Sequence, residues 1–132
     1  MFNKVRYNGV KTGREEKTLK VLIAAPDRDL LDSLSGLLAL RGWEADAAHD
    51  GAMAAEKSRA VRYGAALVDE KIPLIRSADL IKEFEESGIP AILMTEDPGA
   101  RGDAVIKYPF TPEELFSVIG RVAAGKEETE NE

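Results

Sequence analysis

The chain has 132 residues, with 18 Lys and Arg against 24 Asp and Glu, one His, no Cys and 44% hydrophobic residues. This length and apolar content are typical of one compact domain and argue against two full-sized cores. The lack of Cys excludes a disulfide scaffold, a thiolate metal site and a Cys nucleophile. A net charge of −6 would repel a phosphate backbone, so we expect no direct nucleic-acid binding. No apolar stretch approaches the roughly 18 residues that span a bilayer, so we expect no membrane segment and a cytoplasmic location.

The charge is unevenly distributed along the chain. Residues 1–20 carry six Lys or Arg and two Glu, whereas the last eight residues carry one Lys and four Glu. We therefore predict a basic, flexible arm over 1–19, a folded domain over 20–124 and an acidic, disordered tail over 125–132. The arm holds Asn8-Gly9, a dipeptide typical of a hairpin turn. Two interpretations of the arm remain: a basic arm that binds a partner or nucleic acid, or a loosely ordered leader.

The first half of the predicted domain reads as strand, helix, strand, helix. Residues 20–25 form a mostly apolar run that suits a buried parallel strand. Asp27 is placed to cap a helix with its leucines on one face, and Gly42 is placed to end it. A short strand is expected over 43–48, followed by an alanine-rich helix over about 50–63.

The second half continues the alternation. Residues 65–69, 91–95 and 104–107 are the next three predicted strands. Ser77 can cap a helix between the first two of them. After the third, Thr111 to Glu114 reads as a capping box with Pro at the first helical position. This order of elements predicts an α/β fold with a five-stranded, parallel, doubly wound sheet.

The candidate site lies at the carboxyl ends of the predicted strands. The carboxyl ends of parallel strands share one edge of the sheet, where ligands bind. Asp69, Thr95 and Lys107 lie at three of these ends, and together they suit a phosphoryl-handling site: an acceptor, a hydrogen-bond donor and a counter-charge. Each also has a plainer interpretation. Asp69 could begin a turn, Thr95 is ordinary in a strand, and Lys107 could form a permanent salt bridge to Asp69.

Residues 20–124 resemble the receiver domain of two-component response regulators. Three segments carry the resemblance, in the family's order: Leu67 to Pro73, similar to its Asp-x-x-Met-Pro segment, Ile92 to Thr95, and Lys107 to Leu115, similar to its Lys-Pro-Phe-x-x-x-x-Leu. The resemblance implies a flavodoxin-like receiver fold. It also implies that Asp69 accepts a phosphoryl group from a histidine kinase, that Thr95 is the switch hydroxyl and that Lys107 pairs with the phosphoryl group.

The chain departs from the family at the end of the first strand. Family receivers have two adjacent acidic residues there that help to hold Mg²⁺, and the matching positions here are Ala25 and Pro26. Mg²⁺ prefers several oxygen ligands in octahedral geometry, and Asp69 is the one matched acid. Asp27 follows one residue late and is expected to cap the first helix instead. We therefore expect no cofactor, with Mg²⁺ bound only if the site is active.

A second departure is Tyr108, which separates Lys107 from the proline that follows it directly in the family. Neighbouring side chains on a strand point to opposite faces, so this slip turns the ammonium away from Asp69 unless a bulge restores it. The resemblance also implies a cis peptide bond between Tyr108 and Pro109. A smaller departure is Ser77, where the family has glycine.

The last departure is the length of the connection between the fourth and fifth strands. Eleven residues lie between Thr95 and Lys107, and they include two Gly and one Pro. The fourth helix of the receiver fold is therefore expected to be missing or reduced to a turn. The resemblance implies that this helix, the fifth strand and the last helix form a common output and dimer face, which this chain would present in altered form.

Three hypotheses of function follow. The first is a degenerate, non-enzymatic receiver that acts as a protein-interaction module, with weak or no phosphorylation of Asp69. The alternative is an active, Mg²⁺-dependent phosphoacceptor modified at Asp69. The third is a small-ligand-binding domain of flavodoxin-like topology, although the first strand leads into no Gly-rich phosphate loop. The expected partner is a histidine kinase or another signalling protein, and a second copy of the chain in a homodimer is one further alternative.

Overall fold

The structure, a computed structural model, describes residues 18–102 and 104–131. The elements in chain order are β1 (Lys20–Ala24), α2 (Arg28–Leu40), β2 (Glu44–Ala48), α3 (Gly51–Ala60), β3 (Ala65–Asp69), α4 (Ser77–Glu86), β4 (Ala91–Thr95), β5 (Val105–Lys107) and α5 (Pro112–Asn131). Most of the predicted basic arm, including its Asn8-Gly9 turn, lies outside the described residues. Across the described ranges, no helix is both long and apolar enough to cross a bilayer.

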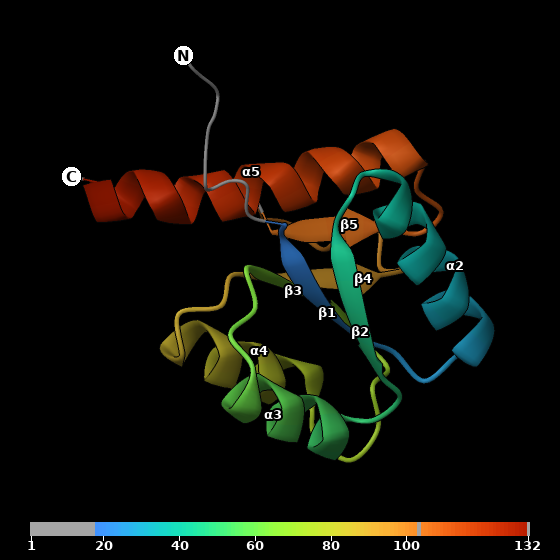
Figure 1. The fold of residues 1–132 in the computed structure, drawn as a ribbon. Coiled ribbons are helices and arrows are strands. Elements are labelled where there is room, and N and C mark those ends of the chain that lie inside the picture. Colours follow the sequence, from blue (N-terminus) through green and yellow to red (C-terminus); the bar gives the residue numbers. More distant parts are fainter. Residues whose placement is uncertain (1–17, 103, 132) are drawn as a thin grey trace.

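The five strands form one parallel sheet in the order β2-β1-β3-β4-β5. Helices α2 and α5 cover one face of the sheet, and α3 and α4 cover the other (Figure 1). This arrangement confirms the predicted α/β fold with its doubly wound sheet. In register, Asp69 lies opposite Met94 and Thr95 lies opposite Lys107, so the ends of β3, β4 and β5 share one edge.

A hydrophobic core lies on each face of the sheet. On β1, Val21 and Ile23 belong to the core under α2 and α5, whereas Leu22 and Ala24 belong to the core against α3 and α4. Strands that are buried on both faces have continuous apolar runs rather than alternating ones. This explains why the interior strands were readable from sequence.

The helix ends agree in part with the expected caps. The Asp27 carboxylate accepts the backbone N–H of Asp29 at 2.9 Å, and Gly42 takes a left-handed φ of 77° after α2. Thr111 and Glu114 form the predicted capping box, because each side chain accepts the other's backbone N–H, at 3.1 and 2.9 Å.

Two helix boundaries differ from expectation. Ser77 is the first residue of α4 rather than its cap, because Arg76 is the extended residue before the helix and makes no side-chain capping bond. Helix α3 ends at Ala60, three residues earlier than expected. The chain becomes extended at Val61, and the side chain of Tyr63 turns into the core against α3 and α4.

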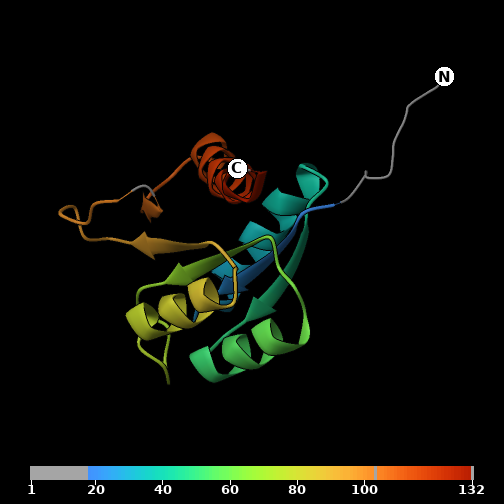
Figure 2. The same cartoon turned by 90° about the vertical axis from the view of Figure 1, so that its left-hand side faces the viewer.

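The connection between β4 and β5 contains no helix among its described residues, 96–102 and 104. The Asp97 side chain instead accepts the backbone N–H of Gly99 at 2.9 Å, and the Asp97 carbonyl accepts that of Ala100 at 3.1 Å. Figure 2 shows this segment as a loop beside the sheet. The helix that Figure 1 labels α4 precedes β4, and the described residues between β4 and β5 form turns, which agrees with the expectation that the helix there is missing or reduced to a turn.

Helix α5 is longer than the sequence suggested. It continues through residues 125–131, for which the composition predicted a solvated, acidic tail. Lys and Glu, which dominate this segment, are good helix formers. The division of the chain into arm, domain and tail stays a prediction.

Leu74, in the loop after β3, is strained. Its φ is 78°, a left-handed conformation that is unfavourable for a bulky side chain. The residue is 77% exposed, so burial of its side chain does little to offset this strain. Leu74→Asn is expected to raise the free energy of unfolding by about 1 kcal/mol, because Asn tolerates this conformation. Chemical denaturation measures the change. Leu40→Asn is the matched control: Leu40 is 80% exposed but has no positive φ, so a similar gain there would contradict relief of strain.

Candidate functional site

Asp69 ends β3 with its carboxylate held by internal donors. The residue is 8% exposed. Its Oδ1 accepts the backbone N–H of Lys71 at 2.7 Å, and its Oδ2 accepts the hydroxyl of Tyr108 at 2.6 Å. Hydrogen bonds to a carboxylate at such distances are among the stronger ones in proteins. Both donors are uncharged groups, so a buried carboxylate is held here by neutral partners.

Tyr108 is the main site residue that sequence reasoning missed. Its ring stacks on Phe110 with centroids 5.4 Å apart, and its hydroxyl also lies 3.7 Å from the sulfur of Met94. Burial, together with the hydrogen bond to Asp69 and its negative charge, raises the pKa of the Tyr108 phenol far above its ordinary value. The hydroxyl therefore remains a donor. The signal was present in the sequence, since Tyr108 is the extra residue in the family motif.

Lys107 points away from Asp69. Its Nζ donates to the carbonyl oxygen of Pro98 at 2.7 Å, in the loop that replaces a helix. The expected slip is confirmed, and the interpretation of Lys107 as a permanent salt bridge to Asp69 is wrong. Neighbouring side chains at a strand end point to opposite sides, so Tyr108 reaches Asp69 where Lys107 was expected. The bond between Tyr108 and Pro109 is cis, as predicted.

The Thr95 hydroxyl also forms its hydrogen bonds with residues other than Asp69. The residue is 1% exposed, its Oγ1 donates to Glu70 Oε1 at 2.6 Å, and the same oxygen accepts the backbone N–H of Asp97 at 3.0 Å. Glu70 Oε2 accepts the backbone N–H of Glu96 at 3.0 Å. The Thr95 hydroxyl and then the Glu96 N–H lower the pKa of the Glu70 carboxyl. Glu70 therefore clamps the end of β4, a contact that the sequence did not reveal.

Removing the Thr95 hydroxyl tests this clamp. Thr95→Val is expected to lower the free energy of unfolding by about 1 kcal/mol at neutral pH, because Glu70 loses a hydrogen bond to its ionised form. Because the pKa of Glu70 is lowered in the folded chain, the stabilisation by its ionised carboxylate is present above the ordinary carboxyl pKa. It is lost as the pH falls through the pKa of Glu70 in the folded chain. Denaturation should therefore show the deficit shrinking below about pH 4. Thr95→Ser keeps the hydroxyl and serves as control; an equal loss in both variants at all pH values would contradict the clamp.

The end of β1 offers few ligands for a metal. Ala25 is buried, Pro26 is exposed, and the Asp27 carboxylate is occupied as the helix cap. Within 18–102 and 104–131, no three His, Asp or Glu side chains are grouped to hold a metal ion. Mg²⁺ binds through carboxylate oxygens and retained waters, and both Asp69 oxygens already accept hydrogen bonds. The residues at this edge therefore do not fit Mg²⁺.

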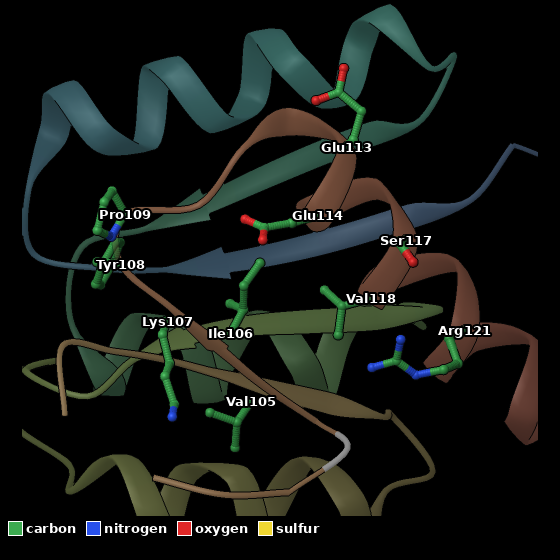
Figure 3. A pocket seen from close by; sticks show the side chains of 10 residues that line it. All are labelled: Val105, Ile106, Lys107, Tyr108, Pro109, Glu113, Glu114, Ser117, Val118 and Arg121. Carbon is green, nitrogen blue, oxygen red and sulfur yellow. The ribbon is translucent and has the colours of Figure 1, made fainter. Parts of the chain in front are cut away.

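An open groove of about 600 Å³ lies between β5 and α5. Its lining residues are Val105, Ile106, Lys107, Tyr108, Pro109, Glu113, Glu114, Ser117, Val118 and Arg121. Ile106 and Val118, which belong to the core, lie between the strand and the helix, and Tyr108 and Pro109 lie at one end (Figure 3). The groove is thus apolar in its middle and charged at its rim.

Comparison with known proteins identifies the fold. No protein-family model matches the sequence, and no curated protein matches it. Among solved structures, a CheY-like response regulator receiver domain from Methanospirillum hungatei JF-1 is similar with a TM-score of 0.77 at 23% identity, covering 86% of this chain and 99% of that one. Chemotaxis response regulator CheY4 of Vibrio cholerae gives 0.70 at 22% identity, covering 80% and 99%. The receiver domain of Francisella response regulator 1452 gives 0.73 at 19% identity, covering 81% and 98%.

Proposed function

We propose that this chain, which has the fold of the CheY-like response regulator receiver domains, is a degenerate receiver of two-component signalling. It acts as a protein-interaction module, and Asp69 is phosphorylated weakly or not at all. The observation that carries the proposal is the closed environment of Asp69, whose two carboxylate oxygens accept the Lys71 N–H and the Tyr108 hydroxyl. The proposal includes no enzymatic activity and a cytoplasmic location, where two-component phosphotransfer takes place.

The state of Asp69 supports the proposal chemically. Phosphoryl transfer to a carboxylate needs an oxygen lone pair aimed at phosphorus and a cation to neutralise the charge that develops on the transferred group. The Tyr108 hydroxyl, 2.6 Å from Oδ2, occupies that oxygen. Ala25 and Pro26 stand where the family has its metal-holding acids, so the cation lacks its ligands. Both requirements of the chemistry are thus weakened at once.

The other candidate residues support the same conclusion. Lys107 would supply the counter-charge to a phosphoryl group, but it is bonded to the Pro98 carbonyl. Thr95 would donate to a phosphoryl oxygen, but it is bonded to Glu70. Each contact stabilises one conformation of the loop between β4 and β5. The site therefore favours a constant shape over a switch.

The proposed partner is a histidine kinase or another signalling protein, with a second copy of the chain as an alternative. The groove between β5 and α5 is the surface that we expect to bind it. Its lining includes the core residues Ile106 and Val118, which are 7% and 5% exposed, together with charged residues such as Lys107. A surface of this kind, apolar in the middle and polar at the rim, is typical of transient protein interfaces.

Beryllofluoride with Mg²⁺, which mimics a phosphoryl group on Asp, tests the proposal. We expect no saturable change in the NMR amide signals of Asp69 and Thr95 when the wild-type chain is titrated. Asp69→Asn serves as the control for non-specific effects of the reagent. Saturable, Mg²⁺-dependent shifts that vanish in Asp69→Asn would instead establish the active phosphoacceptor.

Restoring the acidic pair is the complementary test. The double variant Ala25→Asp and Pro26→Asp is expected to gain Mg²⁺ binding, measured by calorimetry, because it returns two carboxylates to the edge that holds Asp69. The matched control is Ala25→Asn and Pro26→Asn, which adds similar side chains without charge and should gain little. No difference between the two variants would show that these positions do not face Asp69.

A further inference from the structure

The Glu70 carboxylate binds two hydrogen-bond donors at the end of β4. Its Oε1 accepts the Thr95 hydroxyl at 2.6 Å, and its Oε2 accepts the backbone N–H of Glu96 at 3.0 Å. Two donors that reach the two oxygens of one carboxylate form a bidentate, charge-assisted contact, which is the usual way in which proteins bind carboxylates. Here the bound carboxylate belongs to the chain itself, to the residue that directly follows β3.

We propose that the Thr95 hydroxyl and the Glu96 N–H form a binding site for a small carboxylate anion, and that Glu70 occupies this site as a built-in ligand. Carboxylates from solution are excluded in the wild-type chain because the tethered side chain fills the site first. A ligand that stays in place keeps the end of β4 in one state, in agreement with a constant shape. The proposal needs no modification of Asp69, so it goes beyond the proposed function and does not depend on it.

The two donors are positioned by contacts that do not involve the Glu70 carboxylate. The Thr95 oxygen accepts the N–H of Asp97 at 3.0 Å, which leaves the hydroxyl hydrogen to point toward another acceptor. The Thr95 carbonyl oxygen accepts the N–H of Tyr108 at 2.9 Å, so β5 anchors the end of β4. The backbone N–H of Glu70 donates to the carbonyl oxygen of Met94 at 3.0 Å, a contact that a side-chain substitution retains. The pair of donors should therefore persist when the carboxylate is removed.

The site combines a buried donor with access from solvent. Thr95 is 1% exposed, so its hydroxyl lacks an acceptor once the Glu70 carboxylate is gone, and a buried donor without an acceptor is costly. Glu96 is exposed and Glu70 is half-buried, so the site opens to solvent on their side. The Lys71 ammonium, 3.5 Å from the Glu96 carboxylate, adds positive charge at the same edge. A small anion can therefore reach the buried hydroxyl from solution.

A carboxylate suits this site better than a phosphate does. Two neutral donors match the two oxygens of a carboxylate, whereas a phosphate dianion carries more oxygens and more charge than they can satisfy. The Asp69 carboxylate at the same edge of the sheet also repels a dianion more strongly than a monoanion. The two donors lower the pKa of Glu70, so its side chain is ionised at neutral pH. A monoanion such as acetate only restores the charge that Glu70 itself brings.

Acetate added to Glu70→Ala tests the proposal in the intact chain. We expect saturable shifts of the NMR amide signals of Thr95 and Glu96 at millimolar acetate, because a free anion lacks the tether that gives Glu70 a high effective concentration. At the same ionic strength, the wild-type chain should show no such shifts. Adding Thr95→Val to Glu70→Ala removes one donor and should weaken acetate binding about tenfold. Inorganic phosphate should bind Glu70→Ala more weakly than acetate does.

Glu83→Ala is the matched control for the loss of a hydrogen-bonded carboxylate. The Glu83 carboxylate also accepts two donor atoms, Nε and Nη2 of Arg59, at 3.0 and 2.9 Å, but it lies on α4 and leaves the donors at the end of β4 untouched. The amide signals of Thr95 and Glu96 should therefore remain insensitive to acetate in Glu83→Ala.

Three outcomes would overturn the proposal: no saturable acetate response in Glu70→Ala, an equal response in the wild-type chain, or tighter binding of phosphate than of acetate. If Glu70→Ala is unfolded in chloride, refolding by acetate at equal ionic strength supports the site. If it is unfolded in both salts, Glu70→Gln, which keeps one accepting oxygen, takes its place with a smaller expected response. No measurement here uses a phosphodonor or Mg²⁺, so a failure is separate from a failure of the proposed function, which the beryllofluoride titration decides.

Discussion

Between about pH 9 and about pH 11, the free energy of unfolding is expected to fall by roughly 2–3 kcal/mol, because two tyrosines resist ionisation in the folded chain. Burial and a hydrogen bond to a carboxylate raise the pKa of both Tyr63 and Tyr108 far above the ordinary value near 10. A group with a raised folded pKa contributes stability below its unfolded pKa and loses it as the pH rises toward the folded value. Each phenol should thus cost about 1.4 kcal/mol per pH unit above 10.

Chemical denaturation at a series of alkaline pH values measures this loss, and ultraviolet absorbance of phenolate reports ionisation directly. Tyr63→Phe and Tyr108→Phe should each remove about half of the slope. If the free energy of unfolding still falls with rising pH in the double variant Tyr63→Phe and Tyr108→Phe, other groups such as lysines cause the fall. Early ionisation of both phenols in the folded chain would contradict the two hydrogen bonds to Asp46 and Asp69.

Gly51→Ala is expected to lower the free energy of unfolding by about 1–3 kcal/mol, the usual cost of overpacking a core. A Cβ at Gly51 would lie 2.7 Å from Cβ of Ile75 and 3.1 Å from its backbone nitrogen. The N–H of Gly51 also donates to the carbonyl oxygen of Pro73 at 2.8 Å, so α3 begins tightly against the loop that follows β3. Relief requires this loop to move, since one of the contacts is with backbone.

Gly36→Ala is the matched control, because Gly36 lies within α2 and a Cβ there meets nothing within 4 Å. It should stabilise the chain by about 0.5–1 kcal/mol, since Ala is the better helix former. Thermal and chemical denaturation of both variants provide the comparison. Equal changes in the free energy of unfolding in Gly51→Ala and Gly36→Ala would show that helix propensity, not the contact with Ile75, determines the effect of Gly51→Ala.

The strands were the most predictable part of the fold. The bounds of β3 and β4 agree with the sequence to the residue, because both are apolar runs that stop at a polar side chain, Asp69 or Thr95. Helix boundaries were less certain where they depend on tertiary contacts. The end of α3, for example, is set by Tyr63, which leaves the helical path to fill the core and reach Asp46.

The candidate site was predictable in its position but not in its bonds. Strand order alone brings Asp69, Thr95 and Lys107 to one edge of the sheet. Which side chain reaches which partner depends on single-residue steps at the strand ends. Tyr108 directly follows Lys107 and makes the contact with Asp69 that the receiver motif assigns to Lys107. Glu70 directly follows Asp69 and accepts the Thr95 hydroxyl, a contact for which the motif assigns no residue.

The two border strands of the sheet, β5 and β2, decide how it can meet other sheets. The strand order makes β5 an outer strand, and among the described residues its outer side pairs with no other strand, which is a template for association with other chains. It has three residues, and one of them is the charged Lys107. At the opposite border, β2 carries Glu44 and Asp46. Short length at one border and charge at both are features that disfavour growth into an extended β aggregate.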